Sequence, residues 1–524
     1  MDSRETENNT GLRLLKRSKT GLIRVIFSRT GLALLCLLGQ ALVLLAGFLW
    51  FERHTFSIIS GHRLIAVFMA IYLINTPMDP TAKLTWLLII FPLPIFGALL
   101  YLFTRSEWGH RTMKARLTQI QRENRHALRQ DSQVLEALKI ADPGAAAMVN
   151  YVSRSGCYPV YSGCDVTYFP LGENKFKVLL EELEKAEKFI YLEYFIVGEG
   201  LMWGKILEIL ARKAKQGVDV RMMYDGSCEF SLLPRSYPRQ LEKLGIRCKV
   251  FSPVHPFVST HYNYRDHRKI LVIDGHTAFN GGINLADEYI NHVSRFGHWK
   301  DTAVMVRGEA AESFTLMFLE LWNLTGRSQN PMPPMPKHIP SGQGFVMPYA
   351  DDPLDGEKVG KQVYIDLLNR ARRYAHIMTP YLILDAELEG ALIYAARRGV
   401  EVTLLLPGIP DKKTPYAIAK TYYRRLLNAG VRIYEYTPGF VHAKVFVVDD
   451  REAVVGTINL DYRSLYHHFE CATYLHSVAC IPEIEADFQE TIAKGRLVTR
   501  ENIRTEKITV RLTGWIMKLV APLM

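Results

Sequence analysis

Cysteine is scarce in this chain, and several motifs that would define a particular chemistry are missing. The seven cysteines among 524 residues are scattered and never occur in C-x-x-C spacing, which argues against a disulfide framework and a cysteine-ligated zinc site. The G-x4-G-K-[ST] loop that holds nucleotide phosphates is absent. No H-E-x-x-H pair offers a zinc site either, so we expect neither a metal nor another cofactor.

Basic residues outnumber acidic ones, and the formal net charge is +11 at pH 7. Such an excess favours acidic partners, either nucleic acid or anionic lipid, without choosing between them. The location of the charge is more informative. Lys and Arg are dense in residues 1–30 and again just after residue 103, on both sides of a long apolar region.

Residues 31–103 contain apolar runs that are long enough to cross a bilayer. The runs 31–51 and 84–103 carry no charge, and a membrane helix tolerates the two prolines of the second run as a kink. The piece 55–76 is ambiguous, because Arg63 would have to snorkel or pair. The basic flanks place both ends of the region in the cytoplasm, which requires an even number of crossings. Three crossings, with the remainder outside, are the alternative.

The rest of the chain consists of a connector and two similar halves. Residues 104–164 form a charged, helix-forming connector, after which strand and helix patterns alternate over residues 165–329. A Pro-rich linker at 330–340 precedes residues 341–500, where the same order returns, so we predict an α/β fold with a tandem repeat. Residues 501–524 predict a basic amphipathic helix that lies either on anionic lipid or on the protein itself.

Each half ends in the same motif: a His, a Lys two positions later and an Asp five positions beyond that. The alternating, β-branched run after each His is typical of a short buried strand, so His and Lys project from one face of it. An imidazole beside an ammonium group suits phosphate chemistry. The candidate catalytic residues are His267, Lys269, Asp274, His442, Lys444 and Asp449, and the Gly-rich tails add Asn284 and Asn459 as candidate phosphate-binding residues.

The two motif aspartates have a different expected role from the histidines and lysines. Asp274 and Asp449 follow their histidines by an odd number of residues, so in a regular strand they point away from the His/Lys face. We therefore expect them to be structural and to hold the turn that follows. Another carboxylate must then orient each imidazole.

The duplicated His-x-Lys-x4-Asp motif with its Gly-x-x-Asn tail resembles that of the phospholipase D superfamily, over about residues 165–490. The stretch Gly281-Gly-Ile-Asn-Leu-Ala-Asp-Glu-Tyr289, together with the apolar amino-terminal region, is similar to bacterial cardiolipin synthases. The resemblance implies two phospholipase D-like α-β-α repeats that form one pseudo-twofold catalytic unit behind a transmembrane helical region. It also implies a multi-pass protein of the bacterial inner membrane, and the basic flanks predict that the catalytic part is cytoplasmic.

The same resemblance points to the carboxylates that orient the imidazoles. It implies Asp301 as the partner of His267 and Glu470 as the partner of His442. Two acidic residues near the first motif, Asp287 and Glu288, are lower-ranked alternatives. The resemblance also favours His267 as the nucleophile and His442 as the acid and base, although the residues alone do not order the two.

The implied reaction joins two phosphatidylglycerol molecules and releases glycerol through a phosphohistidine. Exchanging one phosphodiester for another needs no energy donor, which agrees with the missing nucleotide loop and with the absence of a D-x2-D-G-x2-A-R motif for CDP-activated lipid. Phosphatidylglycerol, other anionic phospholipids and the membrane are the expected partners, and nucleic acid is not. Oligomerisation stays open. Alternatives are a hydrolytic phospholipase D, a synthase that uses phosphatidylethanolamine as donor, and a membrane scaffold without activity.

Other residues near the motifs do not predict a specific role. The histidines around them, His468 among them, lack metal-ligand spacing and are expected to be solvated or hydrogen-bonded. The tract 253–266 is either a lid or a plain surface loop. Phe195 is expected in the core or along the catalytic cleft.

Overall fold

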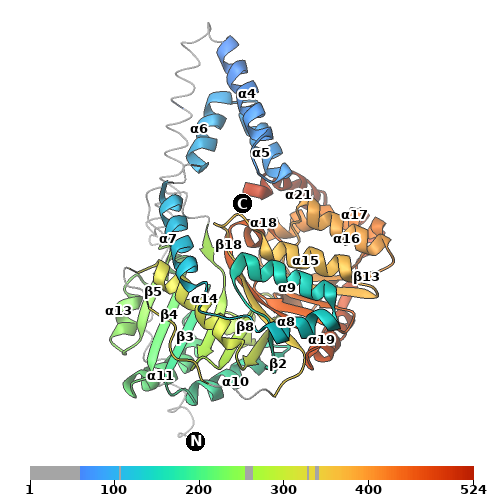
Figure 1. Ribbon diagram of the computed structural model, residues 1–524. Helices are drawn as coiled ribbons and strands as arrows, with labels where there is room; N and C mark the ends of the chain where they lie inside the picture. The colour runs from blue at the N-terminus through green and yellow to red at the C-terminus, as the bar shows by residue number, and fades with distance from the viewer. Residues whose placement is uncertain are drawn as a thin grey trace, which may run out of the picture.

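The computed structural model describes residue 46 and residues 59–105, 108–253, 264–326, 330–336 and 341–523. The basic tail 1–30 and, apart from residue 46, the run 31–51 lie outside the described residues, as do 254–263 of the tract 253–266. Two large sheets meet in the middle of the protein with helices on their outer sides, and a narrower group of apolar helices projects from one end (Figure 1).

The first repeat forms a seven-stranded sheet in the order β2-β10-β8-β7-β3-β4-β5. Strands β3, β4 and β5 are parallel, and the others pair antiparallel. All six residues of β3 are buried, as expected for a strand covered on both faces. The bounds are β2 (Asp165–Phe169), β3 (Phe189–Tyr194), β4 (Asp219–Asp225), β5 (Arg247–Phe251), β7 (Lys269–Ile273), β8 (Thr277–Gly281), β10 (Ala303–Arg307), α10 (Gly172–Glu184), α11 (Leu201–Lys215), α12 (Cys228–Ser231), α13 (Tyr237–Glu242) and α14 (Ala311–Leu324).

The second repeat forms a longer sheet in the order β1-β11-β18-β17-β16-β12-β13-β14-β19. Its central run, from β18 to β14, reproduces the order and strand directions from β10 to β5, which confirms the predicted repetition. The bounds are β1 (Tyr161–Ser162), β11 (Phe345–Asp351), β12 (Tyr374–Met378), β13 (Glu401–Pro407), β14 (Arg432–Tyr436), β16 (Val445–Val448), β17 (Glu452–Gly456), β18 (His468–His476), β19 (Gly495–Leu497), α15 (Val359–Arg370), α16 (Ala386–Arg397), α17 (Lys413–Ala429), α18 (Tyr462–Tyr466) and α19 (Ile481–Ala493).

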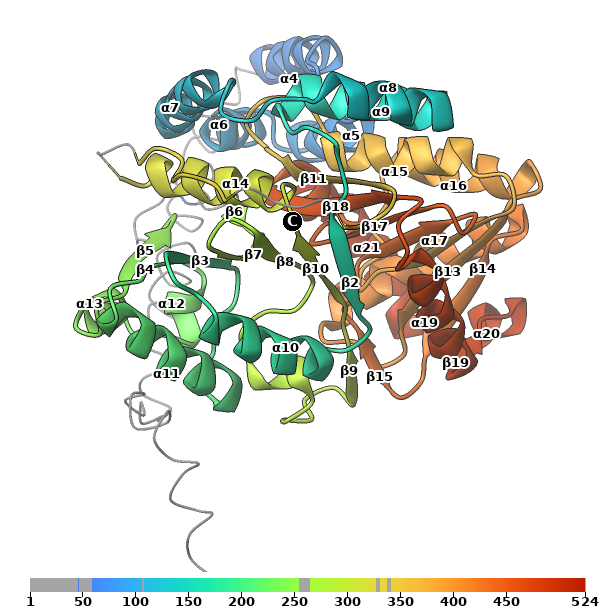
Figure 2. The same cartoon turned by 60° about the horizontal axis from the view of Figure 1, so that its bottom comes forward.

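Two short strand pairs cross between the repeats. Strand β6 (Arg265–Asp266) of the first repeat runs parallel to the start of β18 in the second. Strand β9 (His298–Lys300) of the first repeat pairs in parallel with β15 (Gly439–Val441) of the second, and Figure 2 shows these two side by side. The repeats are therefore joined by backbone hydrogen bonds as well as by packing.

Residues 104–164 form helices, as the sequence predicted, and these helices pack on the protein. The helices are α7 (Trp108–Asn124), α8 (Ser132–Ala141) and α9 (Pro143–Gly156), whose buried side chains, such as Leu138 and Val149, belong to the core around the second sheet. The Asp142-Pro143-Gly sequence begins a helix: Asp142 accepts a hydrogen bond from Ala145 N and Pro143 occupies the first turn. The many charged residues of this segment make the narrow apolar faces of its helices hard to recognise in the sequence.

The apolar end contains α4 (Ile59–Ile74), α5 (Pro80–Ile90) and α6 (Pro94–Arg105). The predicted run 84–103 is therefore two helices rather than one kinked helix. The chain turns at Phe91–Leu93, and Gly97 lies so close to Ile90 that a Cβ there would approach the Ile90 Cα to 2.7 Å. Across the described ranges, no helix combines the length and the apolar character that a bilayer crossing needs.

Candidate active site

Backbone pairing between the repeats brings the two motif histidines to the centre of the protein. His267 directly follows β6, and its N–H donates to the Phe469 carbonyl in β18 at 3.0 Å. His442 directly follows β15, and its N–H donates to the Lys300 carbonyl in β9 at 2.7 Å. Each histidine thus lies against a strand of the opposite repeat.

Each imidazole binds a buried carboxylate from that opposite repeat. His267 Nδ1 lies 2.9 Å from both carboxylate oxygens of Glu470, and His442 Nδ1 lies 2.6 Å from Asp301 Oδ2. Both predicted carboxylates are therefore in the site, but the predicted pairing is wrong, because we expected Asp301 beside His267 and Glu470 beside His442. The exchange follows from the crossed strands: Asp301 comes just after β9, and Glu470 lies within β18.

The two pairs differ in their electrostatics. Burial raises the pKa of Asp301, but the adjacent His442 and Lys444 outweigh it and hold the net pKa below its usual range. Burial raises the pKa of Glu470 well above its usual range, and the nearby Lys269 offsets this only in part. Burial also lowers the pKa of both imidazoles, to about 4 for His442 and well below its usual range for His267.

The motif lysines are buried beside their histidines. Lys269 Nζ donates to the His267 carbonyl, and Lys444 Nζ donates to the His442 carbonyl and lies 2.9 Å from His442 Nδ1. Burial lowers the pKa of Lys269 to about 8 and that of Lys444 to about 7. Two ammonium groups of this kind provide positive charge where a phosphate could be held.

The two motif asparagines are also buried, in different hydrogen-bond environments. Asn284 Oδ1 accepts from Ile196 N at 3.0 Å, and its Nδ2 donates to the Tyr289 hydroxyl at 2.7 Å. Asn459 Oδ1 has no hydrogen-bond partner among the residues that the structure describes. The first asparagine is thus held by its own repeat, and the second leaves an acceptor unused.

The motif aspartates bind backbone groups, which agrees with the structural role that strand parity predicted and gives no support to the catalytic one. Each accepts hydrogen bonds from three successive backbone N–H groups, Asp274 just before and at the start of β3 and Asp449 just before and at the start of β12. They hold the beginning of a neighbouring strand rather than the turn that follows. The donors are Glu187, Lys188 and Phe189 for the first and Arg372, Arg373 and Tyr374 for the second.

The lower-ranked carboxylates have other partners. Asp287 accepts hydrogen bonds from Leu201 N at 2.9 Å and Met202 N at 2.8 Å, at the start of α11. Glu288 lies 3.5 Å from Arg295. Neither residue forms a hydrogen bond with a motif histidine among the described residues.

His468 is a site residue that the sequence interpretation missed. Its ring is buried 5.2 Å from the His267 ring, and its Nδ1 lies 3.4 Å from Glu470 Oε1. Neither ring nitrogen has a hydrogen-bond partner within the described chain, so the expectation of a solvated or hydrogen-bonded imidazole is wrong. Strand periodicity could have found it, because His468 and Glu470 lie two residues apart on one strand. Phe195 forms another wall, 4.9 Å from the His267 ring.

One donor set in this site could in principle hold a metal. Ligand atoms of His267, His468 and Glu470 lie within 4.8 Å of one another, and two imidazoles with a carboxylate are ligands that zinc accepts. However, the positive charge of Lys269 lowers the pKa of both imidazoles, and that of Arg265 lowers the pKa of His468. Their positive charge opposes a dication and favours an anion at this position.

Comparison with known proteins identifies the family. A family model described as "Cardiolipin synthase, PLD-like domain" matches residues 179–322 and 364–492, and one described as "Phospholipase_D-nuclease N-terminal" matches residues 64–105. An uncharacterised protein of Streptococcus mutans serotype c is 56% identical over 87% of this chain and 99% of its own length. A protein named cardiolipin synthase from Geobacillus kaustophilus is 35% identical over 94% of this chain and 98% of its own length.

A solved structure shares the fold. The phosphatidylserine synthase of Haemophilus influenzae Rd KW20 superposes with a TM-score of 0.54 at 15% identity, over 68% of this chain and 93% of that one. At this identity the likeness concerns the fold alone. The motif is duplicated, short strand pairs join the two sheets, and the relatives match over almost their full length. The chain therefore belongs to the cardiolipin synthase family of the phospholipase D superfamily.

Proposed function

We propose that this protein is a cardiolipin synthase, a phosphatidyltransferase that joins two phosphatidylglycerol molecules and releases glycerol. The observation that carries the proposal is the pair of histidines, each with a buried carboxylate on Nδ1 and a buried lysine two residues away. Two such groups at one place are what a two-step exchange at phosphorus requires. Relatives that carry the name cardiolipin synthase support the choice of reaction.

The exchange proceeds through a phosphohistidine. His267 Nε2 attacks the phosphorus of the donor lipid and forms a P–N bond, while the P–O bond to the glycerol head group breaks and His442 gives its proton to the departing oxygen. A hydroxyl group of the second phosphatidylglycerol then enters, loses its proton to His442 and attacks phosphorus, which frees His267. Atoms balance as two phosphatidylglycerols giving one cardiolipin and one glycerol. The assignment of the nucleophile rests on the family resemblance.

The remaining site residues act on charge and orientation. Lys269 and Lys444 stabilise the non-bridging oxygens, on which negative charge accumulates in the transition state. Asn284 and Asn459 bind the same phosphate through their side-chain N–H groups. Asp301 and Glu470 fix the tautomer and orientation of the imidazoles, as a triad carboxylate does.

We also propose that residues 31–103 attach the protein to the bacterial inner membrane as a multi-pass region, with the catalytic repeats on the cytoplasmic side. Basic flanks on both sides of that region support this orientation. A membrane lipid substrate then reaches the site from the surface on which the protein resides, and nucleic acid is not a substrate.

The test is the lipid product of the purified protein. Given vesicles of labelled phosphatidylglycerol, the protein should form cardiolipin and free glycerol in equal amounts. Phosphatidic acid as the main product would replace the proposal with hydrolysis, because water would then be the acceptor. A second incubation with added phosphatidylethanolamine should leave the cardiolipin yield per phosphatidylglycerol unchanged. Release of ethanolamine would identify the other donor.

A further inference from the structure

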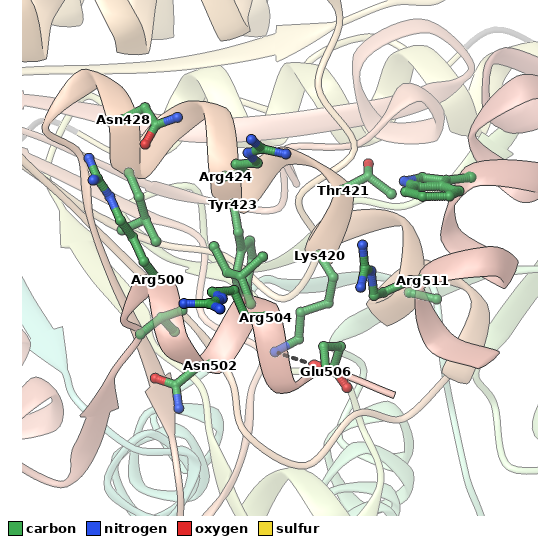
Figure 3. A pocket seen from close by; sticks show the side chains of 15 residues that line it. Lys420, Thr421, Tyr423, Arg424, Asn428, Arg500, Asn502, Arg504, Glu506 and Arg511 are labelled. Atoms are coloured by element: carbon green, nitrogen blue, oxygen red, sulfur yellow. Dashed lines mark ion pairs between the residues drawn. The ribbon is translucent and has the colours of Figure 1, made fainter. Parts of the chain in front are cut away.

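A groove of about 730 Å³ lies between α17, α20 (Arg500–Thr505) and α21 (Ile508–Val520). Figure 3 shows the side chains that line it. None of them belongs to the two catalytic motifs or to their carboxylate partners. The groove is therefore a feature separate from the active site.

Positive charge gathers in this groove. Lys420 is neutralised by Glu435 and by Glu506, the latter at 3.3 Å, and Arg504 makes only an exposed contact of 3.7 Å with Glu501. The other three arginines have no carboxylate within ion-pair distance among the residues that the structure describes. Guanidinium groups of this kind match the oxygens of a phosphate. The basic residues lining the groove are Lys420, Arg424, Arg500, Arg504 and Arg511.

The orientation of α21 is fixed by contact with α17. A Cβ on Gly514 would lie 2.3 Å from the Ala417 carbonyl, so only glycine permits this approach. Lys518 Nζ also lies 3.6 Å from the centre of the Tyr422 ring. One side of α21 thus docks on the protein, which was one of the two alternatives for this helix. Its other side is a stripe of large apolar side chains that are 52% to 68% exposed, formed by Ile508, Leu512, Trp515, Ile516 and Leu519.

Helix α21 lies at the same end of the protein as the apolar helices α4 to α6 (Figure 1). The Thr85 hydroxyl in α5 donates to the Leu519 carbonyl in α21 at 2.6 Å. Large apolar side chains of α4 to α6, such as Phe68 and Leu88, are also exposed. Exposed apolar side chains on neighbouring helices mark an interaction site, and here the basic residues of the groove lie beside α21.

We propose that the groove binds the phosphate head group of an anionic glycerophospholipid of the membrane, whose acyl chains lie along the exposed stripe of α21. Charge complementarity selects a lipid with net negative charge over a zwitterionic one. The apolar stripe beside the arginines adds an interaction that inorganic phosphate cannot make. The proposal rests on the membrane attachment proposed above, and it is independent of the transfer reaction.

The test measures lipid binding to the full-length protein in neutral detergent micelles, in a His267→Ala background that prevents turnover. Brominated phosphatidylglycerol should quench a fluorescence component that the Trp515→Phe variant lacks. Arg424→Gln/Arg500→Gln should raise the half-saturating lipid concentration about tenfold or more, because two charge-assisted contacts are lost. The matched control Arg154→Gln/Arg239→Gln removes two exposed arginines elsewhere and should change nothing.

Three results would overturn the proposal. These are equal affinity in the groove variant and the control, equal quenching by brominated phosphatidylcholine, and full displacement of the lipid by millimolar inorganic phosphate, which would identify a phosphate site. The melting temperatures of both double variants verify that they are folded. If the purified protein made no cardiolipin, the titration would still report lipid binding, so the two proposals fail separately.

Discussion

The two histidine–carboxylate pairs share a backbone framework, but the pKa of their carboxylates is shifted in opposite directions. Asp301 beside His442 has a pKa below its usual range, whereas the pKa of Glu470 beside His267 is well above its usual range. The environment of Glu470 therefore favours a protonated carboxyl, whereas that of Asp301 favours the carboxylate. An exchange with one nucleophile and one acid needs such an inequality, and a perfectly symmetric site would lack it. The comparison thus separates the geometry, which treats the repeats alike, from the charge, which does not.

The largest effect is expected on removing either imidazole. His267→Ala and His442→Ala should each lower the rate of cardiolipin formation by about five orders of magnitude or more, because both steps need both groups. His276→Ala, which removes an exposed histidine of the first repeat, should leave the rate within about twofold. Near-normal rates in either alanine variant would refute the two-histidine mechanism.

Trapping then orders the two histidines. Because His442 also assists the first step, the experiment uses labelled lipid, prolonged incubation and denaturation without acid. We expect a phosphatidyl adduct to form slowly on His442→Ala, which keeps the nucleophile, and none to form on His267→Ala. The reverse pattern would make His442 the nucleophile.

The carboxylates should respond unequally. Asp301→Asn should lower kcat by about 10³-fold to 10⁴-fold, the size seen when a triad carboxylate is replaced by its amide. Glu470→Gln should lower it only about tenfold, because an amide resembles the neutral carboxyl that burial favours at this position. Steady-state kinetics with phosphatidylglycerol measure both losses. Equal losses of kcat in the two variants would contradict the inferred charge difference between the two pairs.

The lysines should set the alkaline side of the pH profile. Their ammonium charge is fully present at low pH and is lost as the pH rises through about 7 for Lys444 and about 8 for Lys269. We therefore expect kcat/KM to fall about tenfold per pH unit between these two values and about a hundredfold per pH unit above both, because the two charges are then lost together. Lys444→Arg keeps its charge at all these values and should move the start of the fall toward the pKa of Lys269, whatever its absolute rate. If the fall of kcat/KM at alkaline pH began at the same pH in Lys444→Arg, Lys444 would not be its origin.

The motif aspartates should give the smallest effect on activity and the most symmetric one. Asp274→Asn and Asp449→Asn each weaken three backbone hydrogen bonds to a charged acceptor and should cost about 1–3 kcal/mol of unfolding free energy. Thermal or denaturant unfolding measures this, and kcat per folded protein should stay within about threefold. A selective loss of kcat in one variant would give that aspartate a role that the geometry does not provide.

The sequence predicted the chemistry-bearing residues better than their partners. Repetition identified His267, Lys269, His442 and Lys444, and strand parity correctly made the two aspartates structural. The exchange of Asp301 and Glu470 depends on β9 and β6 pairing with the opposite repeat, and strands of three and two residues leave no periodic signal. His468 has no metal-ligand spacing in the sequence, and only its position two residues before Glu470 on one strand indicates that it belongs to the site.

The helical segments were also harder to predict. Residues 104–164 carry enough charge to resemble a solvated linker, yet one face of each of α8 and α9 is apolar and buried. For the run 84–103, the absence of charge matched one long helix, while the turn at Phe91–Leu93 is set by local prolines and by the close approach of Gly97. Hydropathy reports how apolar a segment is and not how often its helix is interrupted.

Crossed pairing also bears on how such a protein could have diverged. Each repeat supplies a histidine that only the other repeat can orient, so a single repeat is catalytically incomplete and its simplest active ancestor is a symmetric homodimer. In a homodimer every substitution alters both halves of the site at once. Joining the two copies in one gene removes that constraint, and it is what allows one position to be aspartate and its counterpart glutamate.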